Sequence, residues 1–106
     1  MRATLLPSLV GVNELPALAS QFHMSQNYPN PFNPRTIVSY QVSGVSSVKL
    51  AVYDILGREV AVLVNEKKPA GTYEVMFDGS GLPSGVYIYR LVAGSFVDSK
   101  RMILLK

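Results

Sequence analysis

The feature that most constrains the fold is a series of short segments in which apolar and polar side chains alternate. The series begins at Thr36, and Gly or Pro residues separate each segment from the next. Alternation with a period of two is typical of a β-strand, because successive side chains point to opposite faces of a sheet. No amphipathic stretch of helical period accompanies these segments, so the pattern predicts an all-β domain.

Six segments carry the alternation, and the chain reverses direction between them. Ile55-Leu56-Gly57 fits a three-residue hairpin loop and Gly94-Ser95 a two-residue type II′ turn. In the third segment Val60, Val62 and Val64 are expected to share one face. Six to seven strands in roughly 80 residues favour a small antiparallel β-sandwich behind an extended N-terminal linker. The expected strands are residues 36–42, 47–54, 58–65, 72–78, 86–93 and 96–105.

Composition limits the functional classes. A chain of 106 residues fits one domain, and no run of about eighteen apolar residues predicts a membrane-spanning helix. The net charge of +3 is scattered along the chain, which argues against nucleic-acid binding. Cysteine is absent, so disulfides and a thiolate nucleophile are excluded.

Few residues suggest chemistry. The single histidine, His23, has no acidic residue within eight positions, so we expect neither a catalytic site, a metal site nor a cofactor. Asp54 and Asp78 precede glycine-bearing turns, where aspartate commonly hydrogen-bonds to its own backbone; a calcium site between loop carboxylates is the weaker alternative. Tyr87 and Tyr89 share a strand face and are expected to cover the core, the alternative being a carbohydrate or peptide platform.

The segment Tyr28-Pro29-Asn30-Pro31-Phe32-Asn33-Pro34 is unusually rigid. Each proline fixes φ, removes a donor and biases the residue before it away from the α region. We therefore expect a stiff, extended lead-in to the domain with Phe32 as its anchor.

The residues before this segment have a different character. Residues 1–25 carry apolar clusters broken by Pro7 and Pro16, and we interpret them as a linker or the remnant of an upstream cargo. The end of this linker is expected to pack onto the β domain. A secretory signal is the alternative, since Met1-Arg2 precedes a weak apolar run and Ala17-Leu18-Ala19 resembles a cleavage pattern.

Several motifs, in order and with natural spacing, resemble the type A C-terminal sorting domain of the type IX secretion system over residues 26–106. They are the segment from Gln26 to Pro34, Val52-Tyr53-Asp54-Ile55-Leu56-Gly57-Arg58-Glu59-Val60, Pro69-Ala70-Gly71, Phe77-Asp78, Leu82-Pro83-Ser84-Gly85-Val86-Tyr87-Ile88-Tyr89-Arg90-Leu91, and Lys100-Arg101-Met102-Ile103-Leu104-Leu105-Lys106.

The resemblance implies an Ig-like β-sandwich that directs an N-terminally fused cargo out of a Gram-negative cell. Cargo crosses the periplasm, the outer-membrane translocon recognises the domain, and a sortase-like protease at the cell surface removes it. The cargo is then released or anchored at the surface. The sorting motif implied here comprises Tyr28, Pro29, Asn30, Pro31, Phe32, Asn33, Pro34, Gly85, Val86, Tyr87, Lys100, Arg101, Leu104 and Lys106.

Two further readings remain at this point. One is an uncleaved structural Ig-like domain related to that of the flagellar hook-capping protein, and the other is a carbohydrate-binding sandwich. Under the sorting reading, the strand over residues 96–105 is expected to offer an edge to a receptor strand. Deleting residues 101–106 is then expected to abolish export and to leave most of the sandwich folded.

Overall fold

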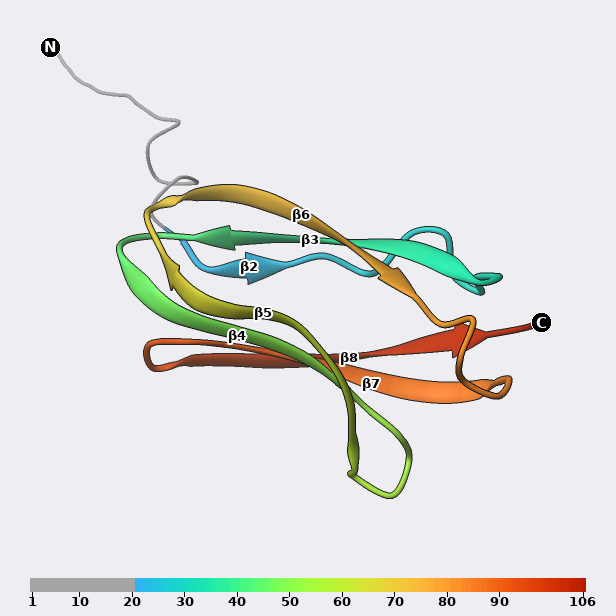
Figure 1. The fold of residues 1–106 in the computed structure, drawn as a ribbon. Helices are drawn as coiled ribbons and strands as arrows, with labels where there is room; N and C mark the ends of the chain where they lie inside the picture. The colour runs from blue at the N-terminus through green and yellow to red at the C-terminus, as the bar shows by residue number, and fades with distance from the viewer. Residues whose placement is uncertain (1–20) are drawn as a thin grey trace, which may run out of the picture.

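The computed structural model describes residues 21–106, and within this range it contains strands and no helix (Figure 1). The interpretation of the first twenty residues as linker, cargo remnant or signal falls outside the described range. All six expected strands are present, and a short additional strand precedes them. The strands are β2 (His23–Met24), β3 (Arg35–Val42), β4 (Ser46–Tyr53), β5 (Glu59–Lys68), β6 (Gly71–Asp78), β7 (Gly85–Ala93) and β8 (Phe96–Leu104).

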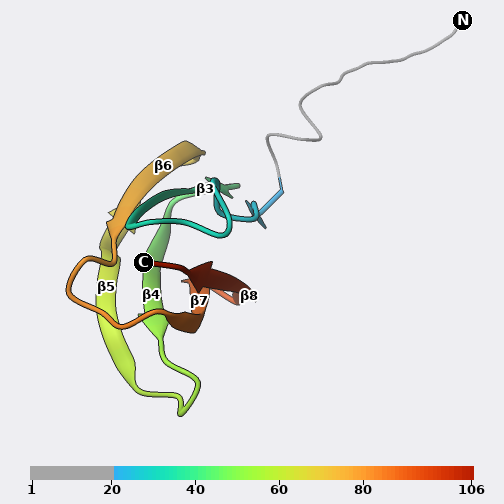
Figure 2. The same ribbon diagram turned by 90° about the vertical axis from the view of Figure 1, so that its right-hand side faces the viewer.

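The strands form two antiparallel sheets that face each other (Figures 1 and 2). The smaller sheet has the order β2-β3-β6 and the larger has the order β5-β4-β7-β8. The all-β sandwich prediction is therefore confirmed. Strand β2 pairs with β3 and buries Met24, so the end of the expected linker does pack onto the domain.

Side chains from both sheets fill the space between them. Alternate residues of β3, β4 and β7 point inward, as the period of two predicts. The core is apolar apart from the buried Asn27 and Thr36. Its largest fully buried side chains include Tyr89, Phe32, Met24, Leu50, Leu91, Met102 and Leu104.

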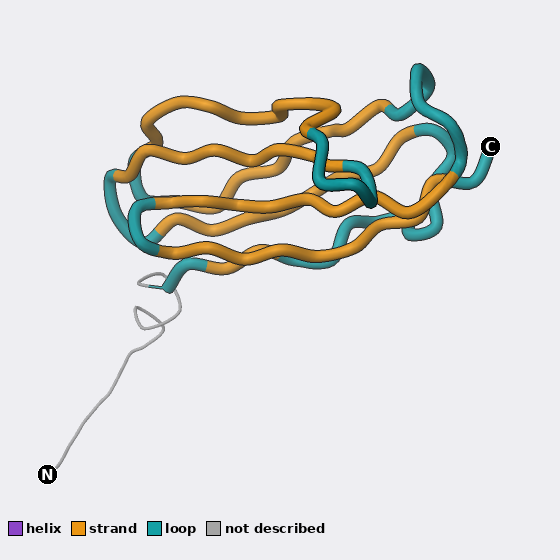
Figure 3. The backbone as a smooth tube through the Cα atoms, turned by 90° about the horizontal axis from the view of Figure 1, so that it is seen from below, coloured by secondary structure: helices purple, strands orange, loops and turns teal. Residues whose placement is uncertain are grey.

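Most connections lie at the two ends of the sandwich, whereas the loop between β4 and β5 projects from its side (Figures 1 and 3). Gly57 and Gly94 adopt φ values of 84° and 60°, in the left-handed region that the expected hairpin turns require. The chain enters the sandwich at one end, and residue 106 lies at the opposite end (Figure 3). No helix in residues 21–106 has the length and apolar character needed to cross a membrane.

Strand β5 corrects one expectation. Its pairing with β4 skips one β5 residue at Leu63 and another at Val60, so β5 contains two β-bulges. Each bulge inserts an extra residue and shifts the alternation by one position. As a result Val60 and Val64 pack against the core while Val62 is 47% exposed, and the three valines do not share a face.

Candidate functional site

The proline-rich segment crosses the outer edge of β8. We call residues 25–34 the strap. Phe32 pairs in parallel with Leu104: its N–H donates to the carbonyl of Ile103 at 2.9 Å, and its carbonyl accepts the N–H of Leu105 at 3.0 Å. The strap thus adds one residue of backbone pairing to the last strand of the larger sheet.

Two side-chain amides extend this contact along the same edge. Gln26 Nε2 donates to the carbonyl of Arg101 at 2.6 Å, and Asn30 Oδ1 accepts the N–H of Ile103 at 2.9 Å. Because an amide side chain carries both a donor and an acceptor, it can substitute for a neighbouring peptide group. The C-terminal half of the β8 edge is therefore covered, which corrects the expectation that this end is open to a receptor strand.

Phe32 is the anchor of the strap, as predicted, and only 2% of it is exposed. Its ring meets that of Phe77 edge-on, with the centroids 6.0 Å apart. Gly79 packs beside it, where a Cβ would lie 3.1 Å from a methyl group of Leu104 and 3.4 Å from the Phe32 ring. A larger residue at position 79 would require the Leu104 side chain to shift by a few tenths of an ångström, so the strap, β8 and the β6–β7 connection meet in close contact.

A buried polar network holds the start of the strap. The N–H of Asn27 donates to the Tyr89 hydroxyl at 2.8 Å, and its side-chain amide donates to Thr36 Oγ1 at 3.0 Å and to the carbonyl of Pro29 at 3.1 Å. The Tyr89 hydroxyl in turn donates to the carbonyl of Ser25 at 3.0 Å. Burial raises the pKa of Tyr89 to about 12, so this hydroxyl remains a donor at neutral pH.

The strap is not extended, contrary to expectation. It bends at residues 29–31 and 33–34, and the peptide bonds before Pro29, Pro31 and Pro34 are cis. The backbone of Tyr28 pairs antiparallel with Ile37 in the smaller sheet, whereas Phe32 pairs with β8 in the larger one. The chain must turn between these two residues because they belong to different sheets.

The structure brings the three expected sorting motifs together. The pairing of β7 with β8 places Gly85 opposite Leu104 and Tyr87 opposite Met102, and the strap lies along the other side of the same β8 residues. The strap, which precedes the other two motifs by more than fifty positions, therefore lies beside them. Among these residues Phe32, Tyr87 and Leu104 are buried and serve packing.

The remaining motif residues lie toward solvent. Tyr28 is 80% exposed. Pro29, Asn30, Pro31, Asn33 and Arg101 are also exposed, and Val86, Pro34 and Lys100 are partly so. Lys106 is tied to the β6–β7 connection, with its N–H on Ser84 Oγ at 2.9 Å and its Nζ on the carbonyl of Ser80 at 2.6 Å.

The two tyrosines of β7 point into the sandwich. Tyr87 and Tyr89 are 5% and 0% exposed, and their hydroxyls reach backbone carbonyls, those of Pro83 and Ser25. This confirms that they cover the core. An exposed aromatic platform built on them, which the carbohydrate-binding reading needs, is excluded.

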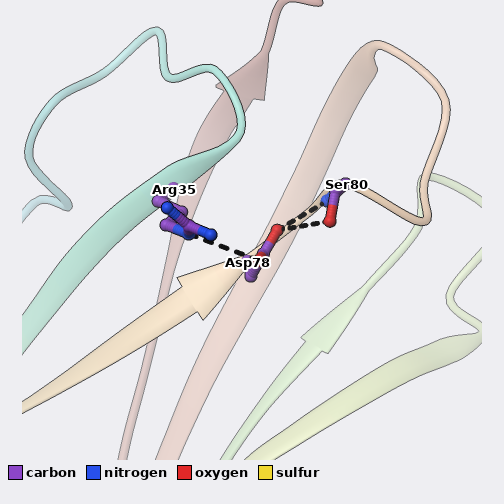
Figure 4. A network of polar contacts seen from close by, with 3 residues as sticks. All are labelled: Arg35, Asp78 and Ser80. Atoms are coloured by element: carbon purple, nitrogen blue, oxygen red, sulfur yellow. Dashed lines mark hydrogen bonds and ion pairs between the residues drawn. The ribbon is translucent and has the colours of Figure 1, made fainter.

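The turn aspartates also follow expectation. Asp78 accepts hydrogen bonds from the hydroxyl and the N–H of Ser80, at 2.6 and 2.9 Å, and pairs with Arg35 at 3.4 Å (Figure 4). These contacts, the Ser80 hydroxyl first, lower the pKa of Asp78. The Arg58 N–H and guanidinium do the same for Asp54. Within residues 21–106 no three His, Cys, Asp or Glu side chains gather as metal ligands would.

Sequence reasoning missed Gln26, Asn27 and Thr36 as parts of this site. Asn27 and Thr36 are the buried polar residues of the described chain, and their partners come from the strap, β3 and β7. The sequence carried one signal, a pair of amides directly before the rigid segment. Their partners could not be inferred because Asn27 and Tyr89 are 62 positions apart.

Fold and site together define a small β-sandwich domain in which a rigid entrance segment is fastened to the last strand. The family model of the secretion system C-terminal sorting domain matches residues 26–105, so the chain belongs to that family. It carries a type IX C-terminal sorting signal, and membership implies export across the outer membrane of a Gram-negative bacterium toward the cell surface. Searches of curated proteins and of solved structures gave no match.

Proposed function

We propose that residues 26–106 direct an N-terminally fused cargo through the type IX outer-membrane translocon. A sortase-like protease then cleaves the domain from the cargo at the cell surface. The domain contributes no reaction of its own, and it acts as a preformed surface that the translocon recognises. The surface comprises the strap, the start of β7 and the end of β8.

The observation that carries this proposal is the convergence of the three motifs on β8. A family match gives the general role, and the shared location of Tyr28–Pro34, Gly85–Tyr87 and residues 100–106 supports one recognition surface. Exposed residues of the surface, such as Tyr28 and Arg101, are available for contact because the core does not use them.

The test is an export assay with the complete chain. A fluorescent reporter with its own signal for the inner membrane is fused before residue 1 and expressed in a bacterium with an active type IX system. We expect the reporter at the cell surface or in the medium, and in the periplasm of a strain without the translocon. Mass spectrometry of the exported reporter then shows whether the domain has been removed. Periplasmic retention in both strains would contradict the proposal.

The expectation for removal of residues 101–106 changes in the light of the structure. Met102 and Leu104 are fully buried, so the deletion removes core contacts together with the terminal motif. A sharper variant is Leu105→Ser with Lys106→Ser, since both residues are exposed. Val45→Ser is the matched control, because Val45 is exposed and outside the three motifs.

We expect the double variant to leave the reporter in the periplasm and the control to be exported normally. Both should show the unfolding midpoint of the unaltered chain to within a few degrees, because exposed substitutions cost about 0.5 kcal/mol or less. Normal export of the double variant would remove the terminal motif from the recognition surface. A reporter that is exported with the domain still attached would favour the uncleaved structural role.

A further inference from the structure

We propose that the edge of β8 from Val97 to Arg101, which no backbone of the strap pairs with, is a pairing site for an extended segment of a partner protein that carries acidic and apolar side chains. The inference deepens the proposed function and rests on it for the export role of that partner. It narrows the expected pairing edge from residues 96–105 to the first half of the strand, because the strap covers the end.

The geometry of β8 makes this half available. In an antiparallel pair, alternate residues direct both backbone groups toward the partner strand and the residues between them direct theirs away. Ile103 and Leu105 belong to the outward set, because their backbone groups bond to the strap. By the same alternation Val97, Ser99 and Arg101 point outward, and the described chain places no strand beside them.

Only local or side-chain contacts fill these outward positions. The N–H of Ser99 bonds to the Asp98 carboxylate at 2.9 Å, and the carbonyl of Arg101 accepts from the side chain of Gln26. The amides of Gln26 and Asn30 occupy the places that a neighbouring strand would fill. Both hydrogen bonds are exposed, so a partner strand that replaces them would lengthen its pairing into residues 101–103.

The surface around the edge selects the chemistry of the partner. An open hollow of about 480 Å³ lies beside it, lined among others by Val86, Ile88, Ile103 and Arg101. Val97 adds an apolar side chain that is 58% exposed. Lys100 and Arg101 have no ion-pair partner within residues 21–106, and Arg90 contacts only the Ser99 hydroxyl and the Tyr53 ring among those residues. Apolar and acidic side chains in alternation complement this combination.

The other strand edges fit such a partner less well. Strand β5 is bulged twice, and bulges twist an edge away from a regular strand. Strand β2 has two residues. Strand β6 is regular but exposes Glu74, which has no ion-pair partner within residues 21–106 and repels an acidic segment. We favour a peptide over an anionic membrane because a lipid surface makes no use of a row of free backbone groups.

The experiment titrates the purified complete chain with model ligands and follows backbone amide signals by NMR. The probes are a short peptide of alternating Glu and Val, the same peptide with Lys in place of Glu, and vesicles of phosphatidylglycerol. We expect the Glu peptide to shift the amides of Val97, Ser99 and Arg101 and to bind about tenfold more tightly than the Lys peptide. Vesicles are expected to leave these amides unchanged.

Three variants and one control, Val97→Ala, separate the contributions of the backbone, the charge and the Gln26 side chain. Val97→Pro removes an outward N–H and is tolerated on an edge strand, so it should weaken the Glu peptide about tenfold while Val97→Ala should not. Arg101→Glu keeps the backbone and should reverse the preference between the two peptides. Gln26→Ala frees the Arg101 carbonyl and should tighten binding about threefold, whereas a merely structural role predicts weaker binding.

The outcomes decide between the proposal and its competitors. Shifts on β6 instead of β8, equal affinity for both peptides, or an unchanged preference in Arg101→Glu would overturn it. Binding of vesicles and of neither peptide would assign the cations to a membrane, and no binding at all would leave them as charges that prevent aggregation. Each of these results leaves the export assay untouched, so the inference and the proposed function fail separately.

Discussion

The two edges of the four-stranded sheet meet the same physical problem in different ways. A free strand edge presents unpaired backbone groups that invite pairing with other chains. Strand β5 interrupts its own register with bulges at Val60 and Leu63, whereas β8 keeps an unbroken register with β7 over its whole length. The end of β8 is instead covered by the strap through Phe32, Gln26 and Asn30.

The difference separates a permanent protection from a removable one. The bulges of β5 are part of its pairing with β4 inside the sheet, so no movement of the strap changes that edge. The cover of β8 is a separate segment that binds by one buried ring and a few hydrogen bonds. An edge of this kind suits a recognition surface, because its exposure depends on contacts that a partner can replace.

The largest expected difference between the two edges is in the free energy of unfolding. It compares removal of the Phe32 anchor at the β8 edge with removal of an apolar side chain from β5. Phe32→Ala should lower the free energy of unfolding by about 3–5 kcal/mol, because it leaves a cavity between Phe77, Gly79 and Leu104. Val62→Ala on β5 should change it by about 0.5 kcal/mol or less, because the Val62 side chain points away from the core and is 47% exposed. Urea denaturation measures both, and equal losses would show that the strap does not stabilise the β8 edge.

A smaller difference is expected between two asparagines. Asn27→Ala removes the buried amide that bonds to Thr36 and Pro29, and should cost about 1–3 kcal/mol because the Thr36 hydroxyl remains buried with fewer partners. Asn65→Ala, at an exposed position of β5, should cost about 0.5 kcal/mol or less. Thermal unfolding compares the two variants. An unchanged melting temperature in Asn27→Ala would mean that the ring of Phe32 alone holds the strap.

The smallest expected effect is on the pH dependence of stability. It should be similar for the two aspartates, Asp54 and Asp78. Asp54 lies before β5 and Asp78 beside the strap, and hydrogen bonds lower the pKa of each below its unfolded value of about 3.9. Each carboxylate therefore stabilises the fold above that value, and the contribution is lost as the pH falls through the lower folded pKa. Asp54→Asn and Asp78→Asn should each reduce the loss of stability on acidification below about pH 4.

The measurement is the urea midpoint at neutral and acidic pH for the unaltered chain and both variants. Similar reductions are expected because each aspartate is held by its own turn and not by the edge near it. A variant that keeps the full acid sensitivity would show that its carboxylate does not contribute.

Short-range patterns in the sequence predicted most of the fold. Alternation placed the strands, Gly57 and Gly94 marked turns that need positive φ, and rigidity around Phe32 marked it as the anchor. Each of these features depends on neighbours within a few positions. Their physical causes are therefore visible in a short stretch of sequence.

The rest depends on contacts between distant segments. The bulges of β5 have no glycine to mark them and arise from pairing with β4, so an unbroken alternation was the natural but wrong expectation. The route of the strap could not be inferred either, because its partners at Ile103 and Leu105 are about seventy positions away. The sequence predicted the three motifs of the candidate surface separately. That they lie side by side could be seen only in the folded structure.

The contact of Phe32 with Leu104 also has a consequence for how this chain is made. A ribosome adds residues in order, and the core remains incomplete until Met102 and Leu104 have emerged from it. Until then the sandwich lacks part of its core. The domain therefore postpones its closure until its last strand has left the ribosome, and the earlier strands stay accessible to other factors in the meantime.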